Sequence, residues 1–304
     1  MYLSLPQRLN SLSLATATLL LTFLSPISLS PSMSVSLSTQ VQAQTPQDQV
    51  NEAEQLLKEG RDLYQQGQAQ AALNRLQQAS ALFETVKAPQ GKVMTLTQMG
   101  RVYDSLNQYE NSLEAYQQAL EIAQEINDRQ EEAIILDYMG LAYNNLQQYN
   151  DAIAHHQKSL KLFQDIGNRR SEGIVLGNIG IAYLAQDQDA QALPFLRDAL
   201  VIYREVEDKP GEGIILDYLG LAYGKMNQYA EALESHQQGL AIFEELNIPR
   251  SQAITLYNIG TVYSQQGQVK MAQESYQKAL AIFEQVDDSE GIRATRYQME
   301  TLEQ

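Results

Sequence analysis

Apolar residues along the chain recur at helical spacing, and the complete pattern repeats every forty residues. Residues 135–143 read ILDYMGLAY, and residues 215–223, eighty positions later, read ILDYLGLAY. Within one unit the apolar positions lie three or four residues apart, and a polar stretch such as NNLQQYND, residues 144–151, interrupts them once. This pattern predicts two amphipathic helices, each of about 15 residues or about 22 Å, joined by a tight turn.

Small residues occupy fixed positions in each of the six units. A leucine stands four positions before the repeat glycine, a tyrosine follows three positions after it in five units, and small residues follow twelve and nineteen positions after it. A glycine inside a helix costs about 1 kcal/mol relative to alanine, so we expect a partner helix to approach closely there, with alanines of the second helix as the facing surface. One helix pair cannot bury its apolar sides alone, whereas stacked pairs share a continuous core. The repeat glycines are Gly60, Gly100, Gly140, Gly180, Gly220 and Gly260.

The order Leu-x-x-x-Gly-x-x-Tyr, followed by Ala, an aromatic or apolar residue and Ala, resembles the tetratricopeptide repeat. The resemblance covers about residues 51–285 and recurs in register. The usual repeat has 34 residues. We place the six additional residues of each unit between the second helix and the next first helix, where Pro89, Pro210 and Pro249 also lie. This is similar to the forty-residue subfamily of kinesin light chain and the spindle-orientation scaffolds, and it implies an all-α, right-handed superhelical solenoid of antiparallel helix pairs.

The repeats define the expected organisation of the chain. We expect six repeats over residues 50–286 and a C-terminal capping helix over residues 287–304, because Glu300 stands where the next glycine belongs. In the first repeat Leu63 replaces the tyrosine, and we expect Glu54 and Lys58 to make the outer side of an N-terminal cap more polar. Residues 44–49 are expected to form a linker.

The first 43 residues differ in composition from the rest of the chain. They hold one charged residue, Arg8, then an apolar run over residues 12–24, and Val41 and Ala43 form the small-x-small pattern that signal peptidase recognises. The sequence predicts an export signal over residues 1–43, cleaved after Ala43, with an uncleaved N-terminal anchor as the alternative. Because the apolar run is short for a membrane span, we expect no span in the mature form. The expected location is the periplasm, another extracytoplasmic lumen or the medium.

Charge and composition narrow the possible functions. The net charge of −16 disfavours nucleic acids and anionic lipids and is compatible with a basic partner or with a role in solubility alone. The chain has no cysteine, which excludes disulfides and thiolate metal sites. His156 and His236 share a repeat position with Tyr116 and Tyr276, so we interpret them as packing residues and not as metal ligands. No catalytic or cofactor-binding motif is present, and we expect neither enzyme activity nor a cofactor.

By resemblance to tetratricopeptide arrays, the first helix of each repeat is expected to line a concave groove. The matching positions combine amides, tyrosine rings and aliphatic side chains, which suit an extended peptide. Asn178 and Asn258 match the asparagine that clamps peptide in chaperone-binding relatives. Ile174 and Ile254 stand where those relatives have a lysine, so recognition of a C-terminal carboxylate is not expected. The candidate protein-binding residues are Thr97, Arg101, Asp104, Asp137, Asn144, Asn145, Asn178, Asp217, Lys225, Tyr257, Asn258, Thr261 and Ser264.

These expectations lead to one main function hypothesis and several alternatives. The main hypothesis is an exported, non-enzymatic scaffold or adaptor that binds a protein or peptide in its concave groove. Asp137 and Asp217 would favour a basic or amide-rich segment, or the groove is merely a wettable inner wall without a ligand. The alternative of another class is a regulatory subunit that acts in trans on an envelope hydrolase or protease-like enzyme, and a third is a self-associating structural element. The sequence leaves the partner and the oligomeric state open.

Overall fold

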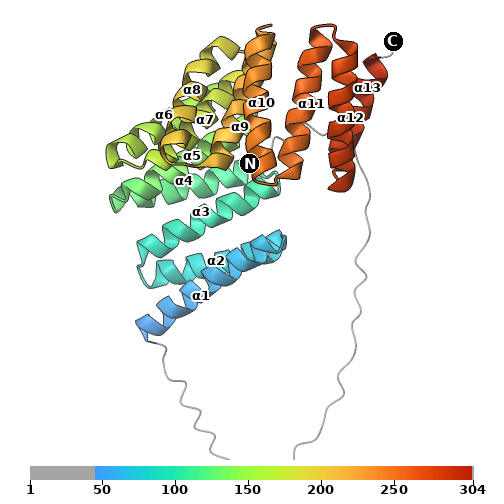
Figure 1. Cartoon of the computed structure of the whole chain (residues 1–304). Helices are drawn as coiled ribbons and strands as arrows, with labels where there is room; N and C mark the ends of the chain where they lie inside the picture. Colours follow the sequence, from blue (N-terminus) through green and yellow to red (C-terminus); the bar gives the residue numbers. More distant parts are fainter. Residues whose placement is uncertain (1–44, 303–304) are drawn as a thin grey trace, which may run out of the picture. The chain divides into compact units, whose positions relative to one another are not determined.

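The computed structural model describes residues 45–302, which form thirteen α-helices and no strand (Figure 1). The helices are α1 (Pro46–Gln65), α2 (Ala69–Thr85), α3 (Pro89–Ser105), α4 (Tyr109–Glu125), α5 (Arg129–Asn145), α6 (Tyr149–Ile166), α7 (Arg169–Ala185), α8 (Asp189–Glu205), α9 (Lys209–Lys225), α10 (Tyr229–Glu245), α11 (Pro249–Gln265), α12 (Val269–Gln285) and α13 (Ser289–Leu302). The expected export signal, residues 1–43, lies outside the described residues. Since α1 begins at Pro46, most of the range expected to be a linker is helical, and Thr45 caps this helix by accepting a hydrogen bond from the amide of Asp48 at 3.2 Å.

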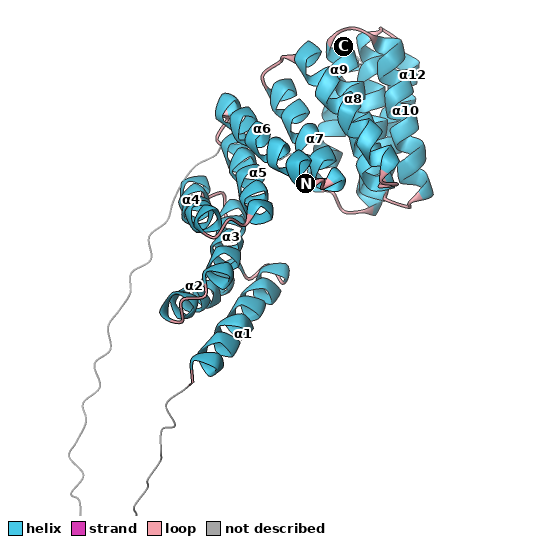
Figure 2. Cartoon of the chain, turned by 90° about the vertical axis from the view of Figure 1, so that its left-hand side faces the viewer, coloured by secondary structure: helices cyan, strands magenta, loops and turns pink. Residues whose placement is uncertain are grey.

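Helices that follow one another in the sequence pack side by side throughout the described range. Each odd-numbered helix contacts the even-numbered helix on either side and also the next odd-numbered helix, whereas no contact joins one even-numbered helix of residues 45–302 to the next. The stack is therefore tighter on the side of the odd-numbered helices, and we call the surface that they form there the inner face. Short loops alone separate the helices (Figure 2). The expected all-α solenoid of antiparallel helix pairs is confirmed.

The turns between helices fall on a strict twenty-residue period. A residue with positive φ stands in each turn, and the twelve positions are Gly67, Lys87, Asn107, Asn127, Gln147, Gly167, Asp187, Glu207, Asn227, Asn247, Gly267 and Asp287. The following amide bonds back to a carbonyl five residues earlier, as from Gln108 to Tyr103 at 2.9 Å, which closes each helix with the same hydrogen-bonded turn. Glycine, asparagine and aspartate tolerate this left-handed conformation best, and they fill nine of the twelve positions.

This period corrects the expected position of the six additional residues. Each loop between helices has two or three residues, and most helices have 17 residues, or about 25 Å. The additional residues therefore lengthen both helices of each pair and do not form an enlarged linker. Pro89, Pro210 and Pro249 lie in the first turns of α3, α9 and α11, where a helix needs no amide hydrogen.

The repeat glycines lie against large side chains of the second helix in each pair. A Cβ atom at Gly100 would lie 2.3 Å from Tyr116 Cε1, and one at Gly140 would lie 2.5 Å from His156 Cε1. The facing residue is always sixteen positions after the glycine, and the other four are Leu76, Leu196, His236 and Tyr276. The sequence led us to expect alanines as the facing surface. Instead, a ring or a leucine side chain fills the space over each glycine, and the alanines are buried beside it.

Candidate protein-binding face

Asp137 of α5 organises a buried polar network where α5 meets α7. Its Oδ1 lies 2.7 Å from His156 Nδ1 of α6 and accepts a hydrogen bond from Asn178 Nδ2 of α7 at 3.0 Å. His156 and Asn178 are buried, and the Asp137 side chain is only 13% exposed. Because a carboxylate only accepts, His156 carries a hydrogen on Nδ1, and Asn144 Nδ2 lies 3.5 Å from its Nε2. Asp137 and Asn178, two predicted binding residues, thus hold neighbouring repeats together, whereas Asn144 contacts His156 within its own repeat.

A second network of the same kind lies eighty residues later, around Asp217 of α9. Its Oδ1 lies 2.6 Å from His236 Nδ1 of α10, and its Oδ2 accepts a hydrogen bond from Thr255 of α11 at 2.8 Å. Gly224 stands where the first network has an asparagine, and His236 Nε2 is buried without a hydrogen-bond partner in the described part of the chain. Since Asp217 is as buried as Asp137, neither carboxylate is free for a basic ligand in the way that the sequence suggested.

Arg101 of α3 lies between two tyrosines near the N-terminal end of the inner face. Its guanidinium carbon is 5.9 Å from the ring centre of Tyr64 of α1 and 5.5 Å from that of Tyr138 of α5, within the range of cation–π attraction. Tyr138 also stacks on Tyr116, with ring centres 5.7 Å apart. Tyr116 donates its hydroxyl hydrogen to Asp104 Oδ2 at 2.7 Å. Burial nevertheless raises the pKa of the Asp104 carboxyl, because desolvation outweighs this hydrogen bond.

The other predicted residues differ in how far they face outward. Thr97 is buried and donates its hydroxyl hydrogen within its own helix, so a partner cannot reach it. Lys225 is exposed, but its Nζ lies 2.7 Å from Asp187 Oδ1 across the contact between α7 and α9. Asn145 is exposed at the end of α5. The half-buried positions on α11 are Tyr257, Asn258, Thr261 and Ser264.

An aliphatic row on the inner face was missed at the level of sequence. We define the aliphatic row by the residue six positions before each repeat glycine in five successive repeats, namely Met94, Ile134, Ile174, Ile214 and Ile254. Met94 and Ile174 are 38% exposed and Ile214 is 44% exposed, while the other two are half-buried. This position shares a helical face with the predicted groove positions, because it precedes them by about one and two turns. The signal that identifies the row is an aliphatic residue at one repeat position in five successive repeats.

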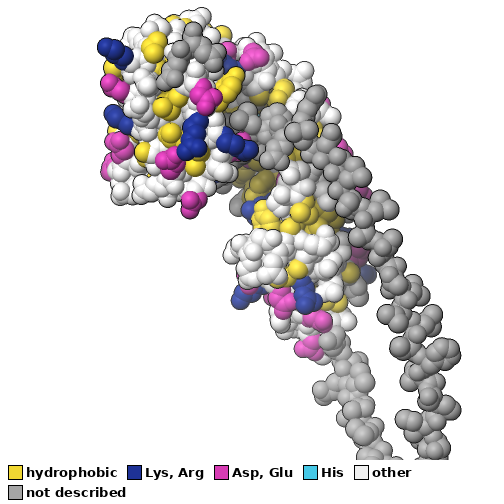
Figure 3. All heavy atoms as spheres, turned by 90° about the vertical axis from the view of Figure 1, so that its right-hand side faces the viewer, with side chains coloured by type: hydrophobic (Ala, Val, Ile, Leu, Met, Phe, Trp, Pro, Cys, Tyr) yellow, Lys and Arg dark blue, Asp and Glu magenta, His cyan; other side chains and the backbone are white. Residues whose placement is uncertain are grey.

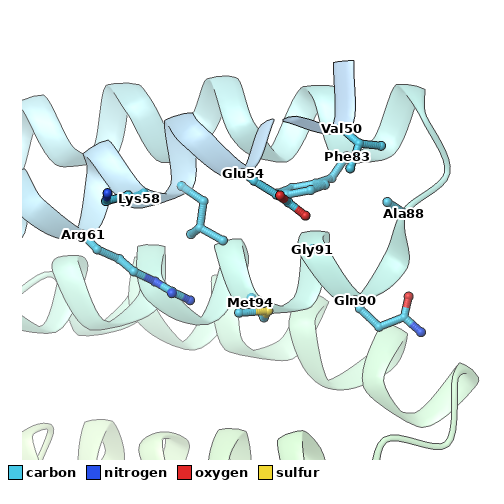
Figure 4. Close-up of a pocket in the computed structure, with 10 residues that line it drawn as sticks. Val50, Glu54, Lys58, Arg61, Phe83, Ala88, Gln90, Gly91 and Met94 are labelled. Atoms are coloured by element: carbon cyan, nitrogen blue, oxygen red, sulfur yellow. The ribbon is translucent and has the colours of Figure 1, made fainter. Parts of the chain in front are cut away.

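Charged residues of the first repeat also lie elsewhere than expected. Glu54 and Lys58 do not form a polar outer side of an N-terminal cap. They line a cavity of about 420 Å³ between α1 and α3, together with Arg61 and Phe83 (Figure 4). Figure 3 shows that hydrophobic side chains are also exposed in groups on the face that it presents, among acidic and basic ones. The surface of the array is therefore mixed, with apolar patches next to charges.

Neither a metal centre nor a membrane-crossing helix is found within residues 45–302. No three His, Asp or Glu side chains of this range come together as metal ligands would, and its two buried histidines each bind a carboxylate instead. Each helix in the same range is too short or too polar to cross a lipid bilayer. The chemistry that the described face offers is apolar contact, aromatic rings, amides and a few charges.

These observations define a class of protein, the helical-repeat solenoids in which successive helix pairs present one continuous face. A family model described as the tetratricopeptide repeat matches residues 47–125, 131–205 and 190–245, and a second model of this repeat matches residues 253–285. The chain therefore belongs to the tetratricopeptide repeat family, as the sequence pattern indicated. A search of curated proteins gave no match.

Solved structures share this fold at low sequence identity. BtubC (BKLC) from P. vanneervenii is 18% identical, with 80% of this chain and 92% of that chain covered and a TM-score of 0.59. The repeats of a putative kinesin light chain from Podosopora anserina are 19% identical, with 67% and 99% covered and a TM-score of 0.55. A Rap protein complexed with Competence and Sporulation Factor is 14% identical, with 83% and 75% covered and a TM-score of 0.60. At these identities the likeness shows the fold alone.

Proposed function

We propose that this protein is a non-enzymatic scaffold that binds a protein or peptide partner along its inner face. The observation that carries the proposal is the aliphatic row. Met94, Ile174 and Ile214 keep more than a third of their surface exposed at the same repeat position, although the core of each helix pair is already complete without them. Aliphatic side chains exposed in register over several repeats are typical of a docking surface. That a Rap protein of similar fold has been crystallised with Competence and Sporulation Factor supports the proposal.

The spacing of the aliphatic row limits how a partner can lie on it. Neighbouring helices pack about 8 to 10 Å apart, so the five side chains span about 32 to 40 Å. An extended segment advances about 3.3 Å per residue and would match the row with an apolar side chain at every third residue. A helical segment advances about 1.5 Å per residue and would match it at every sixth or seventh residue. The period of apolar residues in the partner therefore distinguishes the two modes.

Basic character of the partner has weaker support than the apolar row. Asp137 and Asp217 are occupied by histidine and by neighbouring repeats. The remaining support is the net charge of −16, which attracts basic proteins over a distance of about 8 Å at physiological salt. We therefore expect apolar contacts to determine affinity and charge to affect mainly the association rate.

Matched substitutions test the proposed face. The full chain is affinity-purified from its native cells, and partners are quantified by mass spectrometry for the wild type, Ile174→Asp and Ile214→Asp. The control is Val201→Asp, because Val201 is 54% exposed on the even-numbered helix α8. We expect a partner that both inner-face variants lose at least tenfold and that the control retains. A partner that survives both inner-face variants, or that the control loses equally, would rule out the inner face as the binding surface.

Export from the cytoplasm is part of the same proposal. It is supported by the composition of residues 1–43, with one charge and an apolar run before the small-x-small pattern at Ala43. The measurement is the intact mass and N-terminal sequence of the protein recovered from the envelope and from the medium. A mature chain that starts at Gln44 is expected, and an intact chain found in the cytoplasm would contradict export.

A further inference from the structure

The cavity between α1 and α3 carries charges of opposite sign at its two ends. Its apolar lining includes Leu57, Phe83 and Met94. Glu54 lies beside the ring of Phe83, whereas Arg61 extends toward Met94 (Figure 4). Glu54 and Arg61 are seven residues apart on one helix, which places them about 10.5 Å apart along its axis. The cavity of about 420 Å³ therefore offers a carboxylate, an apolar lining and a cation in that order.

The charged side chains that line this cavity form no ion pair with other residues of the described range. Arg61 Nε is buried and has no hydrogen-bond partner among residues 45–302, and Arg61 and Lys58 form no ion pair within that range. Glu54 and Lys58, one helical turn apart, do not pair with each other either. A buried donor without a partner is unfavourable, so a ligand that satisfies it gains an interaction that the empty cavity lacks.

The next contact between odd-numbered helices, that of α3 with α5, differs from the contact of α1 with α3 at the same repeat positions. Arg101 occupies the same repeat position as Arg61, but the rings of Tyr64 and Tyr138 enclose it. At the position that corresponds to Tyr138, the contact of α1 with α3 has Gln98. Within residues 45–302 no aromatic ring lies over the guanidinium of Arg61, which lines the cavity.

One further carboxylate lies in the field of Arg61. Arg61 acts to lower the pKa of Glu131 at the start of α5, but burial and the nearby Asp128 raise that pKa overall. Glu131 therefore holds its negative charge less firmly than an exposed glutamate would. It competes with a ligand carboxylate without forming an ion pair with Arg61.

We propose that this cavity binds a peptide segment in which two apolar residues separate a positive group from a negative group. The positive group binds Glu54, the apolar residues pack on Phe83, and the negative group binds Arg61 and Lys58. Groups three residues apart in an extended peptide lie about 10 to 11 Å from each other, which matches the spacing of Glu54 and Arg61. The inference rests on the proposed function and specifies the chemistry of one subsite of the same face.

Two probe peptides distinguish the sources of the two charges. In the blocked peptide acetyl-Ala-Lys-Leu-Leu-Glu-Ala-amide the charges belong to side chains. In the peptide Ala-Leu-Leu-Ala with free ends they belong to the termini. Two further blocked probes replace the Lys or the Glu with Gln. Binding to the full chain is measured by isothermal titration calorimetry at low salt. We expect at least one of the two charged probes to bind, and the blocked Gln analogues to bind about tenfold more weakly if the side-chain probe is the ligand.

Charge-neutralising variants then assign each end of the cavity. Arg61→Gln should weaken the charged probe about tenfold and leave the probe without its carboxylate unchanged within twofold. Glu54→Gln should also weaken the probe that carries both charges about tenfold, and it should leave the probe without its positive group unchanged within twofold. Arg293→Gln and Glu300→Gln on α13 make the same charge changes on exposed side chains far along the sequence, and they should change no affinity. Circular dichroism confirms that all four variants remain helical.

The outcomes separate this inference from the proposed function. If neither charged probe binds, or if Arg61→Gln weakens charged and uncharged probes equally, the bipolar site is wrong. Equal effects of the α13 controls would also overturn it. In each of these cases the proposed function still stands if the native partner depends on Ile174 and Ile214, and it falls only if the partner is indifferent to them.

Discussion

Two glycines of helix α9 should respond in opposite directions to the same substitution. Gly220 is a repeat glycine, and a Cβ atom there would lie 2.6 Å from both Cε1 and Nε2 of His236. Gly224 is one turn further along, and a Cβ atom there would meet its nearest neighbour, Val262 Cγ2, at 3.7 Å, an ordinary contact. We therefore predict that Gly220→Ala destabilises the protein and that Gly224→Ala stabilises it.

The magnitudes follow from three contributions. Both substitutions gain about 1 kcal/mol of helix propensity. At Gly220 the added methyl group must displace His236, which is 1% exposed and held by Asp217 at 2.6 Å. Overpacking costs about 1 to 3 kcal/mol, and weakening a hydrogen bond to a charged group costs about 1.5 to 3 kcal/mol. The net change in the free energy of unfolding is a loss of about 1.5 to 5 kcal/mol for Gly220→Ala and a gain of about 1 kcal/mol for Gly224→Ala.

Urea and thermal denaturation measure the global effect, and hydrogen exchange measures the local one. For a domain of this size we expect Tm to fall by roughly 3 to 20 °C for Gly220→Ala and to rise by about 2 to 4 °C for Gly224→Ala. Because each repeat contacts only its neighbours, the loss of protection should be largest in α9 and α10. The reasoning is refuted if the two variants are equally stable, or if Gly220→Ala is no more destabilising in the presence of His236 than after His236→Ala removes the ring.

The same helix allows a test of the unpartnered histidine nitrogen. In the first network Asn144 approaches His156 Nε2, and Gly224 stands at the corresponding position of the second network. Gly224→Asn should give His236 Nε2 a donor and stabilise the protein by about 1 kcal/mol more than Gly224→Ala does. If Gly224→Asn is less stable than Gly224→Ala, a hydrogen-bond donor to His236 Nε2 does not stabilise the protein.

Two further substitutions probe the N-terminal end of the inner face. Asp104→Asn should raise Tm at pH 7, because burial raises the pKa of Asp104, so the stability of the wild type falls as pH rises through that pKa. The advantage of the variant should shrink as pH is lowered through the raised pKa toward about 4, the ordinary value for aspartate, and thermal scans that show a constant difference would contradict this assignment. Arg101→Ala should cost about 1 to 2 kcal/mol in urea denaturation, since two tyrosines flank the guanidinium. A double-mutant cycle with Tyr138→Leu that gives no coupling energy would show that the flanking ring does not contribute.

Most of the fold could be predicted from the residues at the repeat positions. A glycine, a leucine and an aromatic residue at fixed positions specify where two helices meet, so the number and pairing of helices could be inferred without coordinates. The turn positions were equally readable, because Gly67, Asn107, Asn127 and Asn227 lie on a twenty-residue period. The position of the six additional residues was predicted wrongly because a 34-residue repeat served as the reference, whereas the turn residues lie on a twenty-residue period. Residues with positive φ mark the ends of helices more directly than a comparison of repeat lengths does.

The polar networks were not predictable from one repeat alone. Asp137 and Asn178 are 41 residues apart, and they meet because two odd-numbered helices are in contact. Positions that face the groove and positions that face the next repeat lie within one turn of each other on the same helix. Sequence spacing therefore does not tell which polar residue faces a partner and which faces the next repeat. An aspartate at such a position was therefore interpreted as a ligand-binding group, when its hydrogen bonds are used within the array.

The strict repeat also indicates where specificity for a partner should reside. Where all units share one geometry, differences between their surfaces come from the few positions that depart from the pattern. Helix α5 with α6 and helix α9 with α10 carry the same aspartate–histidine pair, in which the histidine is buried and the aspartate side chain is 13% exposed. At one repeat position the first two repeats instead carry arginines. Arg61 lines a cavity between α1 and α3, and Arg101 lies between two tyrosine rings. In the proposed binding mode the aliphatic row would supply affinity along the array, and selection among partners would depend on these two arginines. Exchanging the N-terminal repeat should consequently change which partner binds, whereas exchanging a central repeat should change how tightly it binds.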